Sequence, residues 1–348
     1  MKESSRWLCF VAGKSGGHIV PALHLAHVAQ TEAPTNIMFF SMDTDLDHSI
    51  LDQQKISLHI PLSCSLLYRS IFVRPLALAQ LGYAWLKSMF YLIRHRPQRI
   101  VSTGGLVSIP VVLAGRALRI PITVYNLDAT PGKAARFTAR FATEVCVCFD
   151  VVRPLFPAHS IKRVDYPHRF TPADKQSMQA ARAQLNIPQQ ACVILLLGGS
   201  QGSAFLNSWL TSYVEKLQQN APETAKNIYI IHQAGNRNLA ELKAWYADHG
   251  VTADVFAYRN DIASAYCAAD FVIARAGAGT LFELLFFQKQ AIIVPLETKA
   301  TDHQLDNAYA MAALHPKQFT VIRQTDCITK TDSLTNLIEQ ALSARKST

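Results

Sequence analysis

Residues 8–18 read Leu-Cys-Phe-Val-Ala-Gly-Lys-Ser-Gly-Gly-His, a short apolar run that turns on glycines into a helical pattern. Residues 193–202, Val-Ile-Leu-Leu-Leu-Gly-Gly-Ser-Gln-Gly, repeat this arrangement half a chain later, and residues 271–280 do so a third time. A strand that turns on glycines into a helix offers free backbone N–H groups and the positive end of the helix dipole. The three turns therefore predict sites for phosphate or another anion, in two similar halves.

Two familiar nucleotide-binding motifs do not fit these turns. Gly13-Lys14-Ser15 suggests a P-loop, but that motif needs a glycine at position 8, where the chain has leucine. No clean G-x-G-x-x-G occurs, and no compelling ribose-binding carboxylate follows the first strand at the expected distance. The sequence therefore argues against ATP hydrolysis at a Walker site and disfavours nicotinamide chemistry.

Short apolar runs alternate with longer helical patterns along the chain, which predicts an α/β fold with parallel sheets. Prolines 154, 157, 167 and 172 interrupt this alternation between two series. We therefore predict two domains, residues 1–163 and 164–348, with a terminal helix that can return to the first domain. The predicted strands lie at residues 8–11, 36–40, 99–101, 122–125 and 145–149, and then at 193–197, 228–232, 255–257, 271–274 and 292–295.

The composition is that of an ordinary globular protein. The chain has 348 residues, of which 49% are hydrophobic and 17% charged, enough for two domains with substantial cores. Seven scattered cysteines without C-x-x-C spacing predict buried free thiols in a reducing cytoplasm. The polar first residues lead into a short strand rather than a signal-peptide hydrophobic region, so we expect no export.

The net charge of +9 is concentrated in one segment. Between Gln53 and Thr143 there are twelve lysines and arginines against one carboxylate, Asp128, a net charge of +11 that leaves −2 for the rest of the chain. Such a segment attracts a polyanion, and the two obvious candidates are nucleic acid and an anionic membrane surface.

The neighbouring residues favour the membrane. Residues 71–93 are apolar and aromatic, and arginines flank them on both sides. Arg74 and Lys87 would each cost about 2.5 to 3.5 kcal/mol near the centre of a bilayer, so a spanning helix is disfavoured. A peripheral helix and a core helix with a solvated basic end both fit, because an α/β domain must also pack helices on its sheet. The sequence does not assign Trp85, Phe90 and Tyr91 to lipid or to core.

With these motifs in view, almost the whole chain resembles the MurG family, the membrane-associated UDP-N-acetylglucosamine transferases that make lipid II of peptidoglycan. The family's G-G-T-G-G-H is similar to residues 13–18, its second glycine loop to 104–108, and its G-G-S-Q-G is intact at 198–202. Its H-Q-[ST]-G resembles residues 232–235, its A-x-Y-x-x-A-D the segment up to Asp270, its R-S-G-A-x-T-x-x-E residues 275–283, and its Q-Q-x-x-N-A residues 303–308. The motifs occur in the family's order.

The resemblance implies a GT-B fold, two Rossmann-like domains with parallel sheets facing across a cleft, with the donor nucleotide on the C-terminal domain and the lipid acceptor on the N-terminal one. It implies an inverting displacement between UDP-GlcNAc and a polyprenyl-pyrophosphate-linked acceptor, peripheral binding at the cytoplasmic face of the inner membrane, and no nucleic acid. We expect no cofactor and no metal, because helix N-termini and glycine loops can stabilise departing UDP. We also expect no D-x-D motif and no His/Cys cluster with ligand spacing.

The resemblance also implies roles for single residues. His18 is the preferred residue to receive or position the acceptor's proton, because an imidazole titrates near working pH. Glu283 would bond the ribose, Ser200 the diphosphate, and the backbone near Arg259 the uracil edge, while His303 and Gln304 would reach the donor sugar. The full set of substrate-binding candidates is Ser15, Gly16, Gly17, Gly104, Gly105, Asp128, Arg169, Ser200, Gln201, Gly202, Arg259, Ala278, Gly279, Thr280, Glu283, His303, Gln304 and Asn307, and the catalytic candidates are His18 and Asp128.

The acceptor half departs from the family pattern. Asp128 stands where the family's H-E-Q-N has an asparagine, Lys14 replaces a glycine and Leu106 a tyrosine. The extra carboxylate of Asp128 is either a further base, or it repels a pyrophosphate acceptor unless the positive charge of Lys14 or Arg169 compensates. Three alternatives therefore stay open: a related transferase with another lipid or saccharide acceptor, a GT-B-like UDP-sugar 2-epimerase, and a non-catalytic UDP-sugar-binding or membrane-scaffold protein.

Overall fold

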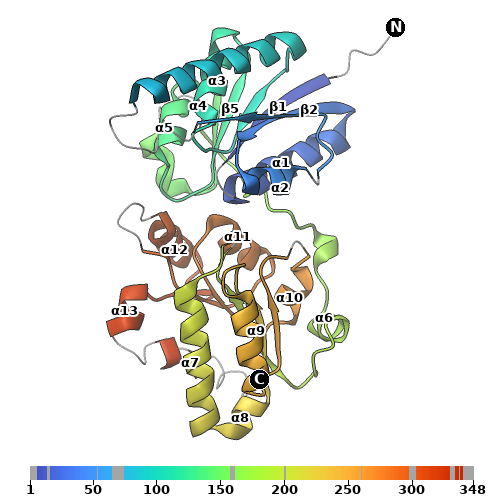
Figure 1. The fold of residues 1–348 in the computed structure, drawn as a ribbon, viewed down its shortest axis with the longest axis vertical. Coiled ribbons are helices and arrows are strands. Elements are labelled where there is room, and N and C mark those ends of the chain that lie inside the picture. Colours follow the sequence, from blue (N-terminus) through green and yellow to red (C-terminus); the bar gives the residue numbers. More distant parts are fainter. Residues whose placement is uncertain are drawn as a thin grey trace. The chain divides into compact units, whose positions relative to one another are not determined.

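The chain forms two compact units, residues 1–169 and 170–348, each built on one parallel sheet (Figure 1). The computed structural model describes residues 6–13, 16–52, 54–64, 74–156, 161–199, 201–259, 261–297, 303–329, 334–336 and 338–339. We predicted a boundary between residues 163 and 164, whereas the units divide between 169 and 170. The segment that follows the last strand of the first sheet stays with that sheet, since the Val164 N–H donates to the Val147 carbonyl oxygen at 3.0 Å.

The first unit carries a seven-stranded sheet in the order β3-β2-β1-β4-β5-β6-β7, with every described pair of neighbours parallel. The strands are β1 (Arg6–Val11), β2 (Thr35–Met42), β3 (Leu58–Leu62), β4 (Ile100–Ser102), β5 (Ile122–Asn126), β6 (Glu144–Val147) and β7 (Ile161–Arg163). The helices are α1 (Gly16–Glu32), α2 (Asp45–Leu51), α3 (Arg74–His95), α4 (Ser108–Ala117), α5 (Lys133–Ala139) and the 3₁₀ helix η3 (Asp150–Leu155).

Both faces of the first sheet are buried, as a parallel sheet requires. Side chains alternate along β1, so Leu8 and Phe10 pack with Ile19 of α1, whereas Cys9 and Val11 pack on the opposite face, against α3 and α4. Figure 1 shows α1 and α2 on one side of the sheet and α3 and α4 on the other. This double burial explains why the central strands read as unbroken apolar runs in the sequence.

The second unit carries a six-stranded sheet in the order β10-β9-β8-β11-β12-β13, also parallel throughout the described pairs. Its strands are β8 (Cys192–Leu197), β9 (Ile228–Gln233), β10 (Ala253–Phe256), β11 (Phe271–Ala274), β12 (Ala291–Ile293) and β13 (Phe319–Val321). Its helices are η4 (Pro172–Asp174), α6 (Met178–Gln184), α7 (Ala204–Asn220), α8 (Pro222–Lys226), α9 (Leu239–Asp248), α10 (Ala263–Ala268), α11 (Ala278–Phe286), α12 (His303–Leu314) and α13 (Gln324–Thr329).

The core of the second unit includes residues close to the end of the described chain. Leu334 and Ile338 are fully buried in the same cluster as Ile194 of β8 and Leu210 of α7. Up to that point the terminal helical segment therefore packs on its own unit. All seven cysteines of the chain are buried and free, as the sequence predicts.

Each sheet has one place where the chain changes direction. From β1 the strand order runs outward to β2 and β3 on one side, and the chain then returns to continue with β4 on the other. The second sheet does the same at β8 and β11. Loops that leave two neighbouring strands in opposite directions open a crevice at the carboxyl ends of those strands, where ligands of such sheets bind. The three glycine turns follow β1, β8 and β11, and Gly104-Gly105 follows β4.

Helix α3, in the basic segment, shows which apolar side chains pack in the core and which face outward. Trp85 and Tyr91 pack against the first unit's core, whereas Phe90 points outward with 62% of its surface exposed. An outward stripe of large apolar side chains runs along the helix: Leu76, Leu78, Tyr83, Leu86, Phe90 and Ile93. Among the residues that the structure describes, no helix combines the length and hydropathy needed to cross a membrane.

A buried polar network lies behind the glycine turn of the second unit. The Asn207 amide nitrogen donates to the Ala234 carbonyl oxygen at 3.0 Å, so its Oδ1 faces His232 Nε2 at 3.0 Å and must accept. His232 Nδ1 then accepts from the Tyr246 hydroxyl at 2.9 Å. His232 is thus a neutral imidazole with its proton on Nε2, and burial lowers its pKa to about 4.

We predict that this network makes the second unit acid-sensitive. Between pH 6.5 and about 4 the unfolded chain binds a proton at position 232 that the folded chain does not bind. The free energy of unfolding therefore falls as pH falls through this window, by at most about 3 kcal/mol, and then levels off. Urea unfolding of wild type and His232→Gln at several pH values from 7.5 to 4.5 measures the difference. His27→Gln, at an exposed position in α1, should leave the pH dependence unchanged; an equal slope for wild type and His232→Gln would contradict the assignment.

Candidate functional site

The first part of the candidate site lies where the turns after β1 and β4 meet. Gly105, with φ of +89°, packs so closely on the β1 turn that a Cβ atom there would lie 2.7 Å from the Gly13 carbonyl oxygen. Gly104, with φ of +120°, lies against the His18 ring, whose Cε1 would be 2.9 Å from an added Cβ. The Thr103 hydroxyl donates to the His18 carbonyl oxygen at 2.8 Å. Only glycine lets the two turns approach, and their approach holds His18 at this edge of the sheet.

His18 has an imidazole nitrogen available at that edge. Its Nδ1 atom is buried and has no hydrogen-bond partner among the residues that the structure describes. Unmet buried polar atoms are uncommon in native structures and point to a ligand or water. Of its predicted companions, Gly16 is half-buried and Gly17 exposed in the first turn of α1, whereas Ser15, like Lys14, lies outside the described residues.

Asp128 comes from a neighbouring strand of the same sheet. It follows β5, which pairs with β4, so it lies at the carboxyl edge that also carries the glycine turns. The buried Asn126 amide donates to the Asp128 carbonyl oxygen at 2.6 Å and fixes this turn. The Asp128 side chain is half-buried. The first sheet therefore presents an imidazole and a carboxylate along one edge.

The second part of the site repeats the glycine contact in the other unit. Gly202 and Gly235, with φ of +75° and +78°, pack backbone to backbone, and a Cβ atom on Gly235 would lie 2.7 Å from the Gly202 Cα. The Asn207–His232–Tyr246 network holds this contact from behind through the Ala234 carbonyl oxygen. Gln201 is exposed beside it, and Ser200 lies outside the described residues. The contact between Gly202 and Gly235 is thus supported from behind, with Gln201 exposed to solvent next to it.

Arg275, which the sequence analysis did not name as a site residue, fastens the end of β11 from within. Its Nε and Nη2 atoms donate to the Ser203 hydroxyl at 3.1 and 2.7 Å, and Nη1 donates to the Val294 and Pro295 carbonyl oxygens. Nη2 also donates to Gln324 Oε1 at 2.7 Å. Burial lowers the Arg275 pKa to about 10, so the guanidinium stays charged at neutral pH. It ties together the turns after β8 and β11 rather than facing a ligand.

Glu283 is held in place by a tyrosine. It lies in α11, and its Oε2 accepts from the Tyr266 hydroxyl at 2.8 Å. Tyr266 is 1% exposed and stacks on Phe287 with ring centroids 4.9 Å apart, so its hydroxyl cannot swing away. Glu283 itself is half-buried. The sequence signal that could have found Tyr266 is its hydroxyl group in the mostly apolar residues 262–269, where Ser264 carries the other side-chain hydroxyl.

The start of α11 carries the remaining donor candidates. No side chain caps this helix at Gly277, so N–H groups of its first turn have no intrahelical partner. Ala278 is buried there, and Gly279 and Thr280 are half-buried. This is the geometry that favours an anion.

Helix α12 supports that turn and adds polar groups beside it. Gln304 Oε1 accepts from the Ala276 and Leu296 N–H groups at 3.2 and 2.9 Å, and its amide nitrogen makes no hydrogen bond with the residues that the structure describes. The Asn307 amide donates to the Ala276 carbonyl oxygen at 3.3 Å, and the residue is 1% exposed. Asn307 therefore positions the turn instead of touching a ligand. His303 Nδ1 is buried and, within the described part of the chain, has no hydrogen-bond partner.

Two predicted arginines lie elsewhere in the units. Arg259 forms a two-pronged ion pair with Asp254, at 2.8 and 2.9 Å, and covers the Phe256 ring. Its guanidinium is thus occupied by Asp254, so only the backbone near Arg259 is left to form hydrogen bonds with the edge of a base. Arg169 is half-buried at the end of the first unit. The structure therefore groups His18, Gly104, Gly105 and Asp128 in one unit, and Gly202, Glu283, His303 and Gln304 in the other.

The sequence analysis missed one group of possible metal ligands. His48, Asp52 and His59 each place one ligand atom within 4.8 Å of the others. The expectation concerned histidines and cysteines at ligand spacing in the sequence, whereas this group includes an aspartate and comes from a helix and a strand that only the fold brings together. The pattern D-x-D also occurs, at residues 43–45 and 45–47. Asp47 is buried and accepts from the Met42 N–H and the Thr44 hydroxyl, both at 2.9 Å.

Comparisons with known proteins agree with this geometry. The glycosyltransferase family 28 N-terminal domain matches residues 8–147, and the glycosyltransferase family 28 C-terminal domain matches residues 193–347. A UDP-N-acetylglucosamine–N-acetylmuramyl-(pentapeptide) pyrophosphoryl-undecaprenol N-acetylglucosamine transferase of Desulfotalea psychrophila is 31% identical over 310 residues, 88% of this chain and 82% of the relative. A protein of the same name from Myxococcus xanthus is 28% identical over 300 residues, 86% of this chain and 76% of the relative.

A solved structure extends the match to the fold. The crystal structure of Acinetobacter baumannii MurG is 27% identical, with a TM-score of 0.72 that covers 98% of this chain and 95% of that one. Both units of this chain have the Rossmann strand order with glycine turns where that order reverses. The sequence matches and the architecture lead to one assignment: the chain belongs to glycosyltransferase family 28, as a member of the MurG family with a GT-B fold.

Proposed function

We propose that this protein transfers N-acetylglucosamine from UDP-GlcNAc to N-acetylmuramyl-(pentapeptide) pyrophosphoryl-undecaprenol, lipid I, and so forms lipid II in peptidoglycan synthesis. The observation that carries the proposal is a glycine turn in each of the two Rossmann sheets at the point where the strand order reverses. The relatives of this chain are named for this reaction. Such turns suit a diphosphate on the donor and a pyrophosphate on the acceptor.

The second unit would hold the donor. The uncapped N-terminus of α11 and the turn at Gln201-Gly202 would meet the diphosphate, with Ser200 and the first-turn residues Ala278, Gly279 and Thr280. Glu283, aimed by Tyr266, would accept from the ribose hydroxyls, and the backbone near Arg259 would read uracil. His303 Nδ1 and the Gln304 amide nitrogen would bond the sugar.

The first unit would hold the acceptor and move its proton. The acceptor hydroxyl oxygen forms the new bond to the anomeric carbon, while the bond from that carbon to UDP breaks and UDP leaves with the electron pair. The proton would pass to His18, whose Nδ1 is free of partners among the described residues, with Asp128 as the second candidate. Gly16, Gly17, Gly104 and Gly105 would line the pyrophosphate, with Ser15 and Arg169 beside them.

The direct test is transfer by the purified protein. Labelled UDP-GlcNAc and lipid I should give lipid II, and turnover should persist in EDTA, because the helix N-termini supply the charge stabilisation for departing UDP. A panel of other polyprenyl-linked acceptors tests the alternative that Asp128 marks a related transferase with a different acceptor. UDP-GlcNAc binding without transfer to any acceptor would indicate a binding or scaffold protein, and loss of turnover in EDTA with recovery in Mg²⁺ would contradict the proposed chemistry.

Glu283 gives a test of the donor site. Glu283→Ala should weaken UDP binding by about 1.5 to 3 kcal/mol, because a charge-assisted hydrogen bond is lost. Tyr266→Phe should weaken it by about 1 kcal/mol, because Glu283 stays but is no longer oriented. Calorimetry with UDP measures both, and Glu223→Ala, at an exposed position in α8, is the matched control. Unchanged affinity in Glu283→Ala would remove Glu283 from the site.

Asp128 gives a test of the acceptor site. If Asp128 takes the proton, Asp128→Asn should lower kcat by about 10²- to 10⁴-fold with little effect on UDP binding. If the Asp128 carboxylate only repels the pyrophosphate of the acceptor, the same change should lower the KM for lipid I. Steady-state kinetics separate the two, since the outcomes have opposite signs. Wild-type kcat and KM in Asp128→Asn would leave proton transfer to His18 alone.

Helix α3 supports a peripheral membrane position, which we place at the cytoplasmic face of the inner membrane. Its outward stripe of apolar side chains ends at Arg94 and His95 and lies in the segment of charge +11. Apolar and basic residues on one exposed helix are typical of helices that lie in the interface of an anionic bilayer. Arg99 contributes less to this basic surface, because its guanidinium donates to the Thr123 hydroxyl at 3.0 Å and pairs with Glu144.

We predict salt-sensitive binding to anionic vesicles through this helix. Each basic residue near such a surface contributes about 1 kcal/mol, so Arg94→Glu with Arg96→Glu should weaken binding at least tenfold. Leu86→Ser with Phe90→Ser should weaken it at any salt concentration, because the apolar anchor is lost. Sedimentation with vesicles measures both, with Leu155→Ser, exposed in η3, as control. Equal binding to neutral vesicles would show that the charge serves another purpose.

A further inference from the structure

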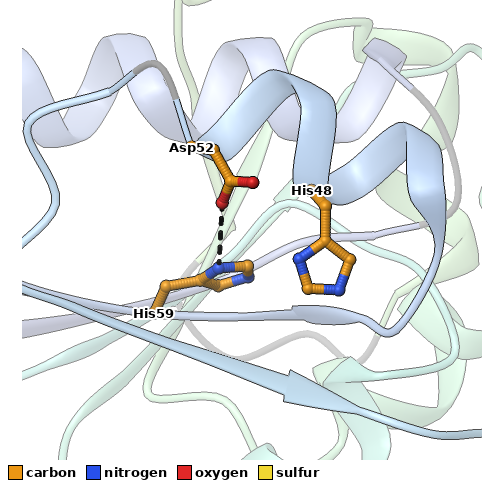
Figure 2. Close-up of side chains that lie close together, drawn as sticks. All are labelled: His48, Asp52 and His59. Atoms are coloured by element: carbon orange, nitrogen blue, oxygen red, sulfur yellow. Dashed lines mark ion pairs between the residues drawn. The ribbon is translucent and has the colours of Figure 1, made fainter.

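The edge of the first unit carries a compact group of nitrogen and oxygen ligands. His48 and Asp52 lie four residues apart, across the last turn and C-cap of α2, so both side chains leave the same face of the helix. His59 meets them from β3. One ligand atom of each residue lies within 4.8 Å of the other two, and Figure 2 shows the three side chains gathered around one point.

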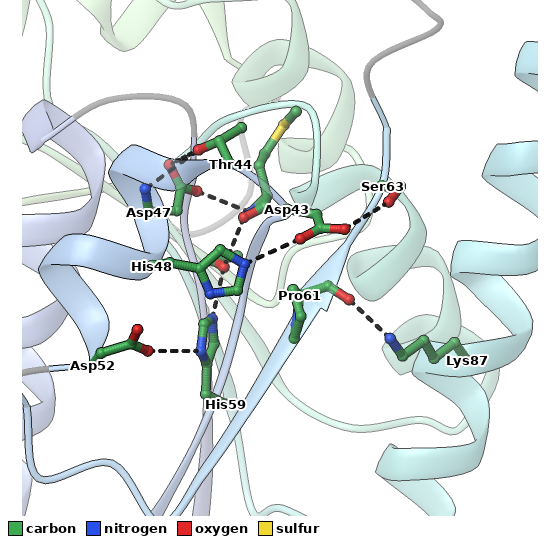
Figure 3. A network of polar contacts seen from close by, with 11 residues as sticks. Asp43, Thr44, Asp47, His48, Asp52, His59, Pro61, Ser63 and Lys87 are labelled. Atoms are coloured by element: carbon green, nitrogen blue, oxygen red, sulfur yellow. Dashed lines mark hydrogen bonds and ion pairs between the residues drawn. The ribbon is translucent and has the colours of Figure 1, made fainter.

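The hydrogen bonds around the two imidazoles fix where their protons are (Figure 3). His48 Nε2 lies 3.0 Å from Asp43 Oδ1, and because a carboxylate only accepts, this nitrogen carries the hydrogen. His59 Nε2 lies 2.8 Å from the Ser41 hydroxyl, which gives its own proton to the Met42 carbonyl oxygen and therefore accepts from His59. In the neutral form, both rings thus keep a lone pair on Nδ1.

Neither of these two lone pairs accepts a hydrogen bond from any residue that the structure describes. His59 Nδ1 lies 4.0 Å from Asp52 Oδ1, which is too long for a hydrogen bond, and His48 Nδ1 makes none with the described residues. The His48 and His59 rings lie edge to face with centroids 5.3 Å apart. Two lone-pair nitrogens beside one carboxylate form an arrangement that a cation completes.

The outer contacts have the form found around bound metals. A histidine that binds a metal through one nitrogen usually donates its other N–H to a carboxylate, hydroxyl or carbonyl, which orients the ring and makes it a better ligand. Asp43 does this for His48, and Ser41 does it for His59. Asp43 is itself anchored by the Ser63 hydroxyl at 3.1 Å.

The ligand set selects the class of cation. Two imidazoles and one carboxylate suit Zn²⁺ and its d-block neighbours, whereas Mg²⁺ and Ca²⁺ prefer oxygen ligands. Zinc bonds of about 2.0 to 2.2 Å at tetrahedral angles put neighbouring ligand atoms about 3.4 Å apart. The three ligand atoms, which lie within 4.8 Å of one another, must therefore approach by up to about 1.4 Å. A change of rotamer of the exposed Asp52 side chain shortens its distances to the two imidazoles, which must also move toward each other. We propose that His48 Nδ1, His59 Nδ1 and Asp52 form a binding site for a zinc-class divalent cation, with water in the fourth position.

A cation in this site would fasten α2 to the edge strand β3. Asp47, next to His48 on the same helix, has its Oδ2 at 3.0 Å from the place where a Cβ on Gly13 would be, so α2 also backs the first glycine turn. From the other side, Lys87 of α3 donates to the Pro61 carbonyl oxygen of β3 at 2.9 Å (Figure 3). The site is structural and does not depend on the proposed transfer reaction.

The test uses the full chain without a polyhistidine tag, stripped with a chelator and titrated with Zn²⁺. We expect one Zn²⁺ per chain by calorimetry, a raised melting temperature and visible d–d absorption of the tetrahedral type with Co²⁺ as probe. Affinity should fall as pH drops below 6, because protonated imidazoles do not bind metals. Mg²⁺ should produce none of these effects.

Variants separate this site from adventitious binding. His48→Gln and His59→Gln should each lower Zn²⁺ affinity at least 100-fold, and Asp43→Asn should lower it about 10- to 100-fold through the outer contact. His27→Gln, in α1 of the same unit, should bind as wild type does. UDP binding, measured on every variant, reports that the chain is folded. Wild-type Zn²⁺ affinity in His59→Gln, or no Zn²⁺ binding by a chain that binds UDP, would overturn the proposal; loss of transfer activity would not bear on it.

Discussion

The fold of this protein depends on close contact between backbones at two glycine turns. Gly105 lies on Gly13 in one unit and Gly202 on Gly235 in the other, at distances that leave no room for a Cβ atom. The first contact occurs where the strand order reverses, between the turns after β1 and β4. The second joins the turns after β8 and β9, beside the point between β8 and β11 where the second sheet reverses. Backbone N–H groups thereby reach a position that side chains would otherwise fill, and they cost no side-chain entropy when they bind an anion.

Around the turns of the second unit, buried polar side chains form the internal hydrogen bonds. Arg275 donates five hydrogen bonds. His232 is neutral and hydrogen-bonded between Asn207 and Tyr246. The Asn307 amide donates to the Ala276 carbonyl oxygen in the turn before α11. Burying such groups is unfavourable unless they are fully paired, so their pairing fixes the turns in one arrangement. In the described part of the chain, His18 Nδ1, His303 Nδ1 and the amide nitrogen of Gln304 have no hydrogen-bond partner, and these are the groups that we propose meet a substrate. Preorganisation of this kind lowers the cost of binding.

The first unit serves a surface as well as a site. Helix α3 packs Trp85 and Tyr91 inward and presents Phe90 and its apolar neighbours outward, beside the arginines that give this segment its charge. On another edge of the sheet, α2 and β3 bring two imidazoles and a carboxylate together. The proposed membrane contact and the proposed cation site thus lie on different elements around one sheet, so each can be altered without rebuilding the glycine turns.

The sequence by itself determined the fold class and the family, and it named most of the residues that we propose for the donor site. Apolar runs ending in glycines can only be strands that turn into helices, and motifs such as residues 198–202 and 275–283 are local in the chain. It could not decide which face of α3 is covered, because an amphipathic helix with aromatic residues on both sides fits core and lipid equally. Nor could it find the bond from Tyr266 to Glu283 or the group of His48, Asp52 and His59. Those contacts join separate elements, and only the pairing of strands and the packing of helices, which are long-range interactions, bring their atoms within bonding distance.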